Sequence, residues 1–125
     1  MKNLSKYTLI LLAIFTLQAC DFDMLGSKVG ADNEFGDQKF KTSIALIELH
    51  KTRYGEYPES LEDIKYIGSW DELQLNGVEY KKLDKGYSLI VTRGWAGKPD
   101  LEYPDDFFQG LGIKMDMKEK EIKQQ

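Results

Sequence analysis

The chain opens with an apolar segment that carries no charge between Lys6 and Asp21. Lys2 and Lys6 give it a positive start, and the run "YTLILLAIFTLQA" follows. Residues 7–20 are too few to cross a bilayer, because a transmembrane helix needs roughly 20 apolar residues. A positive start and a short apolar run are typical of a secretory targeting segment. We therefore predict export, and we expect the fold to form from the residues that follow.

The end of this segment, "LQAC", resembles the lipobox of bacterial lipoproteins, because Leu17, Ala19 and Cys20 match its leucine, small residue and cysteine. The resemblance implies that a lipoprotein signal peptidase cuts between Ala19 and Cys20, and that Cys20 carries diacylglycerol and acyl chains such as palmitate. Each acyl methylene in a bilayer contributes about 0.8 kcal/mol, so these chains would hold a small domain on a membrane. The alternatives are a plain signal peptide cut elsewhere or an uncleaved anchor.

The same resemblance implies a location. It places the chain on a bacterial cell membrane, with the folded part facing the periplasm. Asp21 follows the cysteine directly and resembles the inner-membrane retention signal of enterobacterial lipoproteins. That rule varies among bacteria, so the outer membrane remains an alternative.

Charge and cysteine content exclude several classes of function. The chain has 17 basic and 21 acidic residues and a pI near 5.0, so it lacks the excess of basic residues that nucleic-acid binding requires. Loss of residues 1–19 would remove Lys2 and Lys6 but no acid, and would move the net charge from -4 to near -6. Cys20 is the only cysteine, which excludes an internal disulfide. With lipid on its sulfur, it could be neither a nucleophile nor a metal ligand.

Composition and periodicity divide the chain into four parts. We predict a cleaved lipoprotein signal peptide at 1–19, a lipidated cysteine with a flexible tether at 20–36, one folded domain at 37–113 and a charged tail at 114–125. The tether is predicted because residues 21–36 combine glycines and scattered acids without a sustained period. The tail has few apolar residues and alternating charge, which predicts a frayed helix or a disordered end.

Residues 37–54 have helical periodicity. Apolar residues recur there at the spacing of one helix face: Phe40, Ile44, Leu46, Ile47, Leu49 and Tyr54. Asp37 suits the N-cap, and Gly55 suits the left-handed position that ends many helices. The polar side chains of this segment are expected mainly toward water: Lys41, Glu48, Lys51 and Arg53.

The next segment contains turn and strand signals. Pro58 prevents the helix from continuing, and Ser60 stands three residues before Asp63, as in a capping box for a new short helix. Alternating residues with tight-turn signals at Asn76-Gly77 and Asp84-Lys85-Gly86 predict strands near 71–75, 78–83 and 87–93. An ordered loop at 94–112, with a short final strand around 107–113, completes the predicted antiparallel meander.

The order of these elements resembles the globular domains of type II secretion pseudopilins and of some type IV pilins. The resemblance covers roughly residues 38–93 and rests on Leu46, Tyr54, Gly55, Tyr57, Pro58, Ser60, Leu61, Gly86, Tyr87 and Leu89. It implies an α+β fold in which a long amphipathic helix packs on a small antiparallel meander. An unrelated small α+β domain is the alternative. The chain has no prepilin peptidase site followed by a long apolar helix, so we do not expect a filament subunit.

The residues that could carry chemistry are few. His50 is the only histidine, so it would have to serve any triad or histidine metal site, and a polar surface role is the simpler interpretation. Oxygen ligands for calcium could come from an acidic loop, as major pseudopilins use loops of their sheet. The candidate ligands are Asp100, Glu102, Asp105 and Asp106. Their spacing matches no EF-hand, and a solvated acidic loop is the alternative.

Aromatic residues in glycine-rich loops are the other conspicuous set. Most of them are expected to cover the sheet in so small a domain: Trp70, Trp95, Tyr103, Phe107 and Phe108. Aromatic side chains are enriched at protein interfaces, and Trp95 and Tyr103 are the candidates for a partner surface.

These features lead to three functional hypotheses. The first is a non-enzymatic, lipid-anchored envelope protein that binds another protein, as an accessory or docking component of a secretion or pilus system. The second is a small-ligand or calcium-binding lipoprotein that uses the 100–106 loop. An enzyme with Glu102 and Asp106 as acid and base is the weakest, because paired acids arise by chance in an acidic chain.

Overall fold

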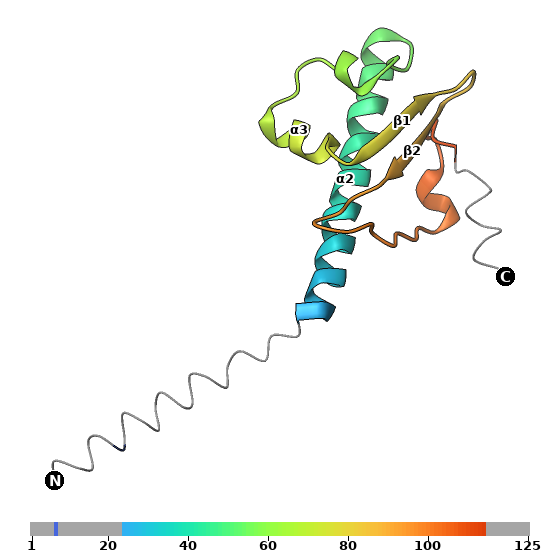
Figure 1. Cartoon of the computed structure of the whole chain (residues 1–125). Coiled ribbons are helices and arrows are strands. Elements are labelled where there is room, and N and C mark those ends of the chain that lie inside the picture. Colours follow the sequence, from blue (N-terminus) through green and yellow to red (C-terminus); the bar gives the residue numbers. More distant parts are fainter. Residues whose placement is uncertain (1–6, 8–23, 115–125) are drawn as a thin grey trace.

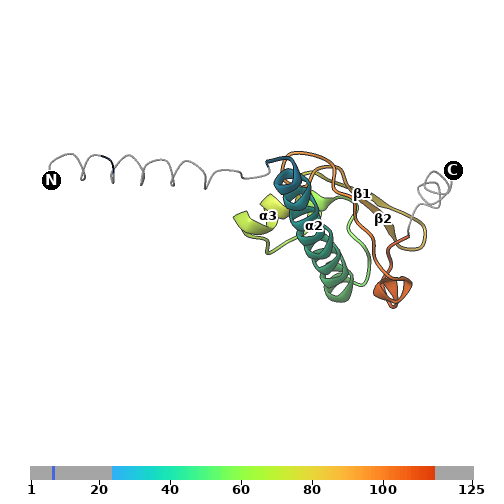
Figure 2. The same cartoon turned by 90° about the horizontal axis from the view of Figure 1, so that it is seen from below.

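The computed structural model describes residue 7 and residues 24–114, and it confirms the predicted α+β class. The elements follow in this order: helix α2 (Met24–Tyr54), 3-10 turn η2 (Leu61–Asp63), helix α3 (Ser69–Leu75), strands β1 (Val78–Lys82) and β2 (Tyr87–Val91), and 3-10 turn η3 (Asp105–Phe108). In both views, α3 and the turn between the strands lie on opposite sides of α2 (Figures 1 and 2). Helix α2 is thus the element on which the others are arranged.

Helix α2 is longer than predicted. It begins at Met24 rather than near Asp37, so residues 24–36, expected as a tether, are helical. It ends where predicted, because Gly55 takes a φ of 80° and its N–H closes the last turn on the Lys51 carbonyl at 2.9 Å. The side chains of Phe40, Ile44 and Ile47 are buried, as their spacing predicted.

The strand predicted near 71–75 is wrong, because these residues belong to helix α3. The reason is a local cap. The Asp71 carboxylate accepts a hydrogen bond from the Gly68 N–H at 2.9 Å, so the first turn gains a side-chain acceptor that a strand would not use. Trp70 and Leu73 point outward, and α3 buries no residue fully.

The other two predicted strands are confirmed as an antiparallel hairpin of β1 and β2. The register pairs Val78 with Val91 and Lys82 with Tyr87. Every second residue of β2 is buried, as alternation predicted, so one face of the hairpin covers α2. Among the described residues the sheet has two strands and not the three of the expected meander.

The expected final strand around 107–113 does not form. Residues 105–108 make η3, and only Ile113 bridges to the hairpin, in parallel with Tyr87. The Tyr87 N–H donates to the Gly112 carbonyl at 3.0 Å, and the Lys114 N–H donates to the Tyr87 carbonyl at 2.7 Å. The carbonyl of Pro104 accepts the Phe107 N–H, which closes a helical turn where a strand was expected.

One core holds these elements together. Apolar side chains from α2, the segment after η2, the hairpin and the C-terminal segment meet in it: Phe40, Ile44, Ile47, Ile64, Tyr87, Leu89, Val91 and Ile113. Each fully buried side chain of this size contributes roughly 1.5–3 kcal/mol to the free energy of folding. The core lies along one face of α2, so other parts of this helix are free to meet solvent.

Candidate functional site

The predicted lipidation and cleavage residues, Cys20 and Ala19, lie outside the described residues. In residue 7 and residues 24–114, no helix has both the length and the apolar character needed to cross a bilayer.

The predicted calcium ligands are exposed and spread over the segment before and within η3: Asp100, Glu102, Asp105 and Asp106. Within the part of the chain that the structure describes, no three Asp, Glu, His or Cys side chains gather as a metal site. The backbone N–H of Asp100 donates to the side-chain oxygen of Asn33 at 2.9 Å. The acidic segment is therefore attached to α2 through its main chain.

Asp32 forms the main attachment of the predicted loop at 94–112 to α2. Its Oδ1 accepts hydrogen bonds from three consecutive N–H groups, of Trp95 at 2.9 Å, Ala96 at 2.7 Å and Gly97 at 2.8 Å. Hydrogen bonds from Gly97, Ala96 and Trp95 lower the pKa of Asp32, against a smaller opposing effect of burial. Nearby, Gly36 lets the chain approach closely, because a Cβ there would meet the Pro99 Cβ at 2.4 Å.

The two aromatic residues predicted to form a partner surface have different surroundings. Trp95 is 63 % exposed, and its ring lies 4.8 Å from that of Phe35. Tyr103 is half-buried and stacks on Phe40 with ring centres 5.0 Å apart. Its hydroxyl donates to Asp37 at 2.8 Å. Tyr103 thus takes part in packing, and Trp95 is the one that meets solvent.

Tyr103 belongs to an aromatic cluster with Phe40, Phe107 and Phe108. Burial raises the pKa of Tyr103, and the hydrogen bond to Asp37 raises it further. Burial alone would raise the pKa of Asp37, but hydrogen bonds from Lys41 and Tyr103 outweigh it, and the pKa is lowered. This cluster fixes the segment after residue 100 on α2. Phe107 and Phe108 pack on Phe40 and against the core that also contains the buried residues of β2.

Glu48 was expected to face water and instead lies half-buried among three donors. Its carboxylate accepts from the hydroxyls of Tyr57 at 3.2 Å and Tyr87 at 3.0 Å, and from the Gly112 N–H at 2.8 Å. Burial and the charge of Glu48 raise the pKa values of both tyrosines. The arrangement joins α2, the turn after it, β2 and the C-terminal segment, so its role is structural.

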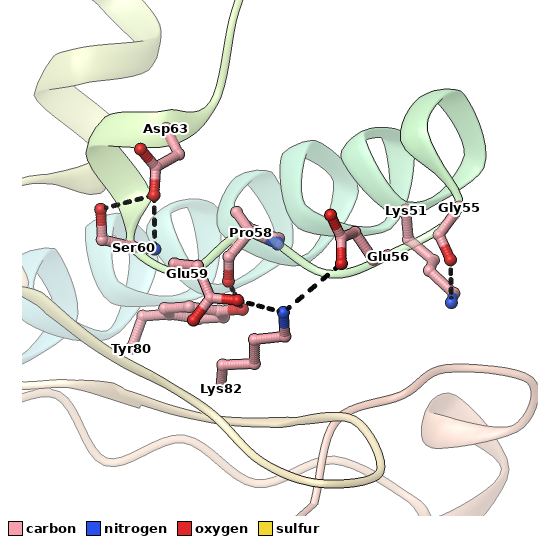
Figure 3. Close-up of polar contacts among 9 residues, drawn as sticks. All are labelled: Lys51, Gly55, Glu56, Pro58, Glu59, Ser60, Asp63, Tyr80 and Lys82. Atoms are coloured by element: carbon pink, nitrogen blue, oxygen red, sulfur yellow. Dashed lines mark hydrogen bonds and ion pairs between the residues drawn. The ribbon is translucent and has the colours of Figure 1, made fainter.

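The turn after α2 is held by its own polar contacts (Figure 3). The Tyr80 hydroxyl donates to the carbonyl of buried Pro58 at 2.6 Å, and Lys82 of β1 pairs with Glu59. Ser60 donates to Asp63 through both its N–H and its hydroxyl, each at 3.0 Å, which is the predicted capping box at η2. These contacts hold the turn in place, and the turn sets the course of the residues that follow η2.

Those residues return to the C-terminal end of α2 and form a pocket with it. The pocket is lined by Leu46, Leu49, His50, Arg53, Tyr54, Ile64, Lys65 and Tyr66. We call the following part of this lining the distal surface, of which all but half-buried His50 are exposed: Leu49, His50, Arg53, Tyr54, Lys65 and Tyr66. Tyr66 is 81 % exposed and Tyr54 is 44 % exposed.

Two cation–π contacts cross the distal surface. The Arg53 guanidinium of α2 lies 5.3 Å from the ring centre of Tyr66, and the Lys65 ammonium lies 5.6 Å from the ring centre of Tyr54. The His50 ring contacts that of Tyr54 at a tilt of 51°, with 4.7 Å between ring centres. Aromatic faces beside cations are suited to binding anionic and apolar groups, and the distal surface is the candidate functional site.

Sequence reasoning missed this surface. The signal that could have identified it is a pair of cation–tyrosine dipeptides, Arg53-Tyr54 and Lys65-Tyr66. Arg53 contacts Tyr66, and Lys65 contacts Tyr54. These contacts form because the chain turns back through η2 and brings the two dipeptides together. Comparisons with protein-family models, curated proteins and solved structures gave no match.

Proposed function

We propose that this chain is a lipid-anchored protein of the bacterial envelope that binds another protein through the distal surface. The observation that carries the proposal is the exposure of Tyr66 and Tyr54 beside Arg53 and Lys65. Tyrosine and arginine, together with tryptophan, are enriched at the energetic centres of protein interfaces. The anchor in the proposal is Cys20, by its resemblance to the lipobox cysteine.

The geometry suits a protein that presents a surface away from a membrane. Cys20 stands shortly before Met24, where α2 begins. A helix of 31 residues is roughly 46 Å long at 1.5 Å per residue, and the distal surface lies at its far end. In Figure 1, α2 runs from the blue end of the described chain to the green turn that precedes η2. A lipid on Cys20 would thus leave the distal surface free to meet a protein in the periplasm.

We further propose that the domain is pilin-like and serves a secretion or pilus machine as an accessory or docking component. Support comes from the local arrangement at the residues of the resemblance. Helix α2 ends at Gly55, and Tyr57 folds back to contact Tyr87 with ring centres 5.0 Å apart. Pro58 then directs the chain toward the hairpin, where the Tyr80 hydroxyl binds its carbonyl.

A membrane capture experiment tests the anchor and the partner together. The full chain with a C-terminal tag is expressed in its bacterium beside a Cys20→Ala control, and membranes are treated with a short crosslinker before purification. We expect the wild-type N-terminal peptide to carry diacylglycerol on Cys20, and we expect one envelope protein in its crosslinked product alone. An unmodified Cys20, or equal recovery with the Cys20→Ala chain, would refute the proposal.

A further inference from the structure

Arg53 and Lys65 are the two cations in the lining of the distal pocket. Among the described residues, no ion pair joins Arg53 or Lys65 to a carboxylate within 4.0 Å. A charged group held over an aromatic ring can still bind an anion at its free edge. Arg53 and Lys65 therefore retain the capacity to bind a carboxylate.

Three of the acids near these cations in sequence contact other groups, and Glu62, three residues before Lys65, is exposed. The Glu48 carboxylate accepts from two tyrosines and an amide, and the Asp63 carboxylate accepts twice from Ser60. Glu56 lies 3.9 Å from the Lys82 ammonium. Although the whole chain has a net charge of -4, the lining of the distal pocket contains Arg53, Lys65 and no acid. The surface is a basic site on an acidic protein.

Tyr66 adds an independent observation. It is the only non-glycine residue with positive φ in the described part of the chain, at 61°. Side chains with a Cβ adopt this conformation at a cost, and such strain concentrates at functional sites. Yet the ring is 81 % exposed and gains little burial in return. Glycine would adopt this φ without strain.

We propose that the distal surface binds an acidic segment of a partner protein. Carboxylates of the segment pair with Arg53 and Lys65, and an apolar side chain packs between Tyr54 and Tyr66 and against Leu49. This inference rests on the proposed docking function and names the chemistry of the partner. A membrane lipid is the less favoured anion, because α2 separates the distal surface from the residue proposed to carry the anchor by roughly 46 Å.

Peptide binding to the full chain in detergent micelles tests the inference. The probe is a short fluorescein-labelled peptide of Glu, Asp and Leu, and its control replaces each acid with the corresponding amide. Fluorescence anisotropy is measured for the wild type, for Arg53→Gln with Lys65→Gln, and for a charge-matched control with Lys81→Gln and Lys85→Gln on the exposed hairpin. We expect the first double variant to bind at least about tenfold more weakly, and the hairpin variant to bind as the wild type does.

A Tyr66→Gly variant separates binding from folding. Glycine accepts a φ of 61° without strain, so we expect an unchanged or higher Tm together with weaker peptide binding. A lower Tm would assign Tyr66 a structural role and overturn its part in the proposal. Equal binding of both peptides, equal loss in both double variants, or binding to phosphatidylglycerol vesicles but not to the acidic peptide would overturn the inference.

Failure of this inference can be distinguished from failure of the proposed function. If the chain with Arg53→Gln and Lys65→Gln still captures the envelope protein from membranes, the docking function stands. The inference that the partner binds through an acidic segment is then wrong. If the wild type captures no protein, the proposed function fails whatever the peptide result.

Discussion

The Tyr87 hydroxyl donates a hydrogen bond to Glu48 Oε1 over 3.0 Å and so ties β2 to α2 through the core. Tyr87 is fully buried. The same carboxylate also receives the Gly112 N–H, so one acid serves the hairpin and the C-terminal segment together.

Replacing Glu48 with alanine should therefore destabilise the fold by about 2 kcal/mol or more, because a buried hydroxyl and an amide lose their acceptor. Chemical denaturation of the full chain measures this change. Glu79→Ala, at an exposed position of β1, is the matched control and should stay within about 0.5 kcal/mol of the wild type. Equal effects of the two substitutions would show that Glu48 is not a structural acceptor.

Asp32 should control the attachment of residues 95–97 to α2. In an Asp32→Ala chain, the three N–H groups lose their common acceptor, and we expect faster hydrogen exchange at Trp95, Ala96 and Gly97. Glu34→Ala, at an exposed position of the same helix, should leave these rates unchanged. Because the pKa of Asp32 is lowered in the fold, this attachment is complete above about pH 4 and is lost as the pH falls through the lowered value.

Three glycine-to-alanine substitutions should change the stability of the fold by different amounts, and one of them should increase it. Gly86 has a φ of 95°, and a Cβ there would lie 1.9 Å from the Gly112 carbonyl oxygen, so Gly86→Ala should cost about 2 kcal/mol or more. Gly110 has a φ of 80°, and a Cβ there would meet no other atom. Gly110→Ala should therefore cost only the backbone strain, about 1 kcal/mol. Gly30 lies in α2 with open space, and alanine there should stabilise the chain by about 1 kcal/mol.

Thermal denaturation measures the Tm of the three variants. We expect the highest Tm for Gly30→Ala and the lowest for Gly86→Ala. The Gly30→Ala result also checks the extended helix, since alanine gains stability there only if residues 24–36 are helical in solution. A loss of stability in that variant would contradict the extension of α2 beyond the predicted start.

The fold should be lost at alkaline pH as buried tyrosines ionise. Burial, with smaller effects of the Glu59 and Tyr57 charges, raises the pKa of Tyr80 from 10.0 to about 12. A pKa raised by folding means that the stabilising effect is complete below about pH 10, and that it is lost as the pH rises toward about 12. Tyrosinate absorbance and circular dichroism recorded on one titration should change together in this range.

A Tyr80→Phe chain provides the control for this titration. It lacks the titrating hydroxyl and the hydrogen bond to the Pro58 carbonyl, so it should be less stable near neutral pH and should lose less of its stability between pH 10 and 12. Identical alkaline profiles for the two chains would contradict the role of Tyr80.

Local sequence patterns could predict the buried face of α2, the end of this helix at Gly55 and the two strands of the hairpin. Apolar spacing places Phe40, Ile44 and Ile47 on one side, and alternation places Leu89 inside. The start of α2 could not be predicted this way. Residues 24–36 have polar and glycine-rich composition, and contacts of Asp32 and Gly36 with a loop more than 60 residues away accompany the helix.

The distal surface could not be predicted for a related reason. Tyr54 has the helical spacing of a core residue, yet it is 44 % exposed because η2 and residues 64–66 return beside it rather than over it. Tyr103 shows the opposite. Its place in a loop predicted an exposed side chain, yet its ring packs on Phe40 and its hydroxyl donates a hydrogen bond to Asp37. In both cases, the path of a connecting segment decides exposure.

The most direct test of the docking function places the photo-crosslinker p-benzoylphenylalanine in the intact bacterium, in one chain instead of Tyr66 and in another instead of Glu79 on β1. We expect illumination to join the chain labelled at position 66 to one envelope protein, and we expect no such product from position 79. Absence of a product from position 66, or the same product from both positions, would contradict a partner at the distal surface.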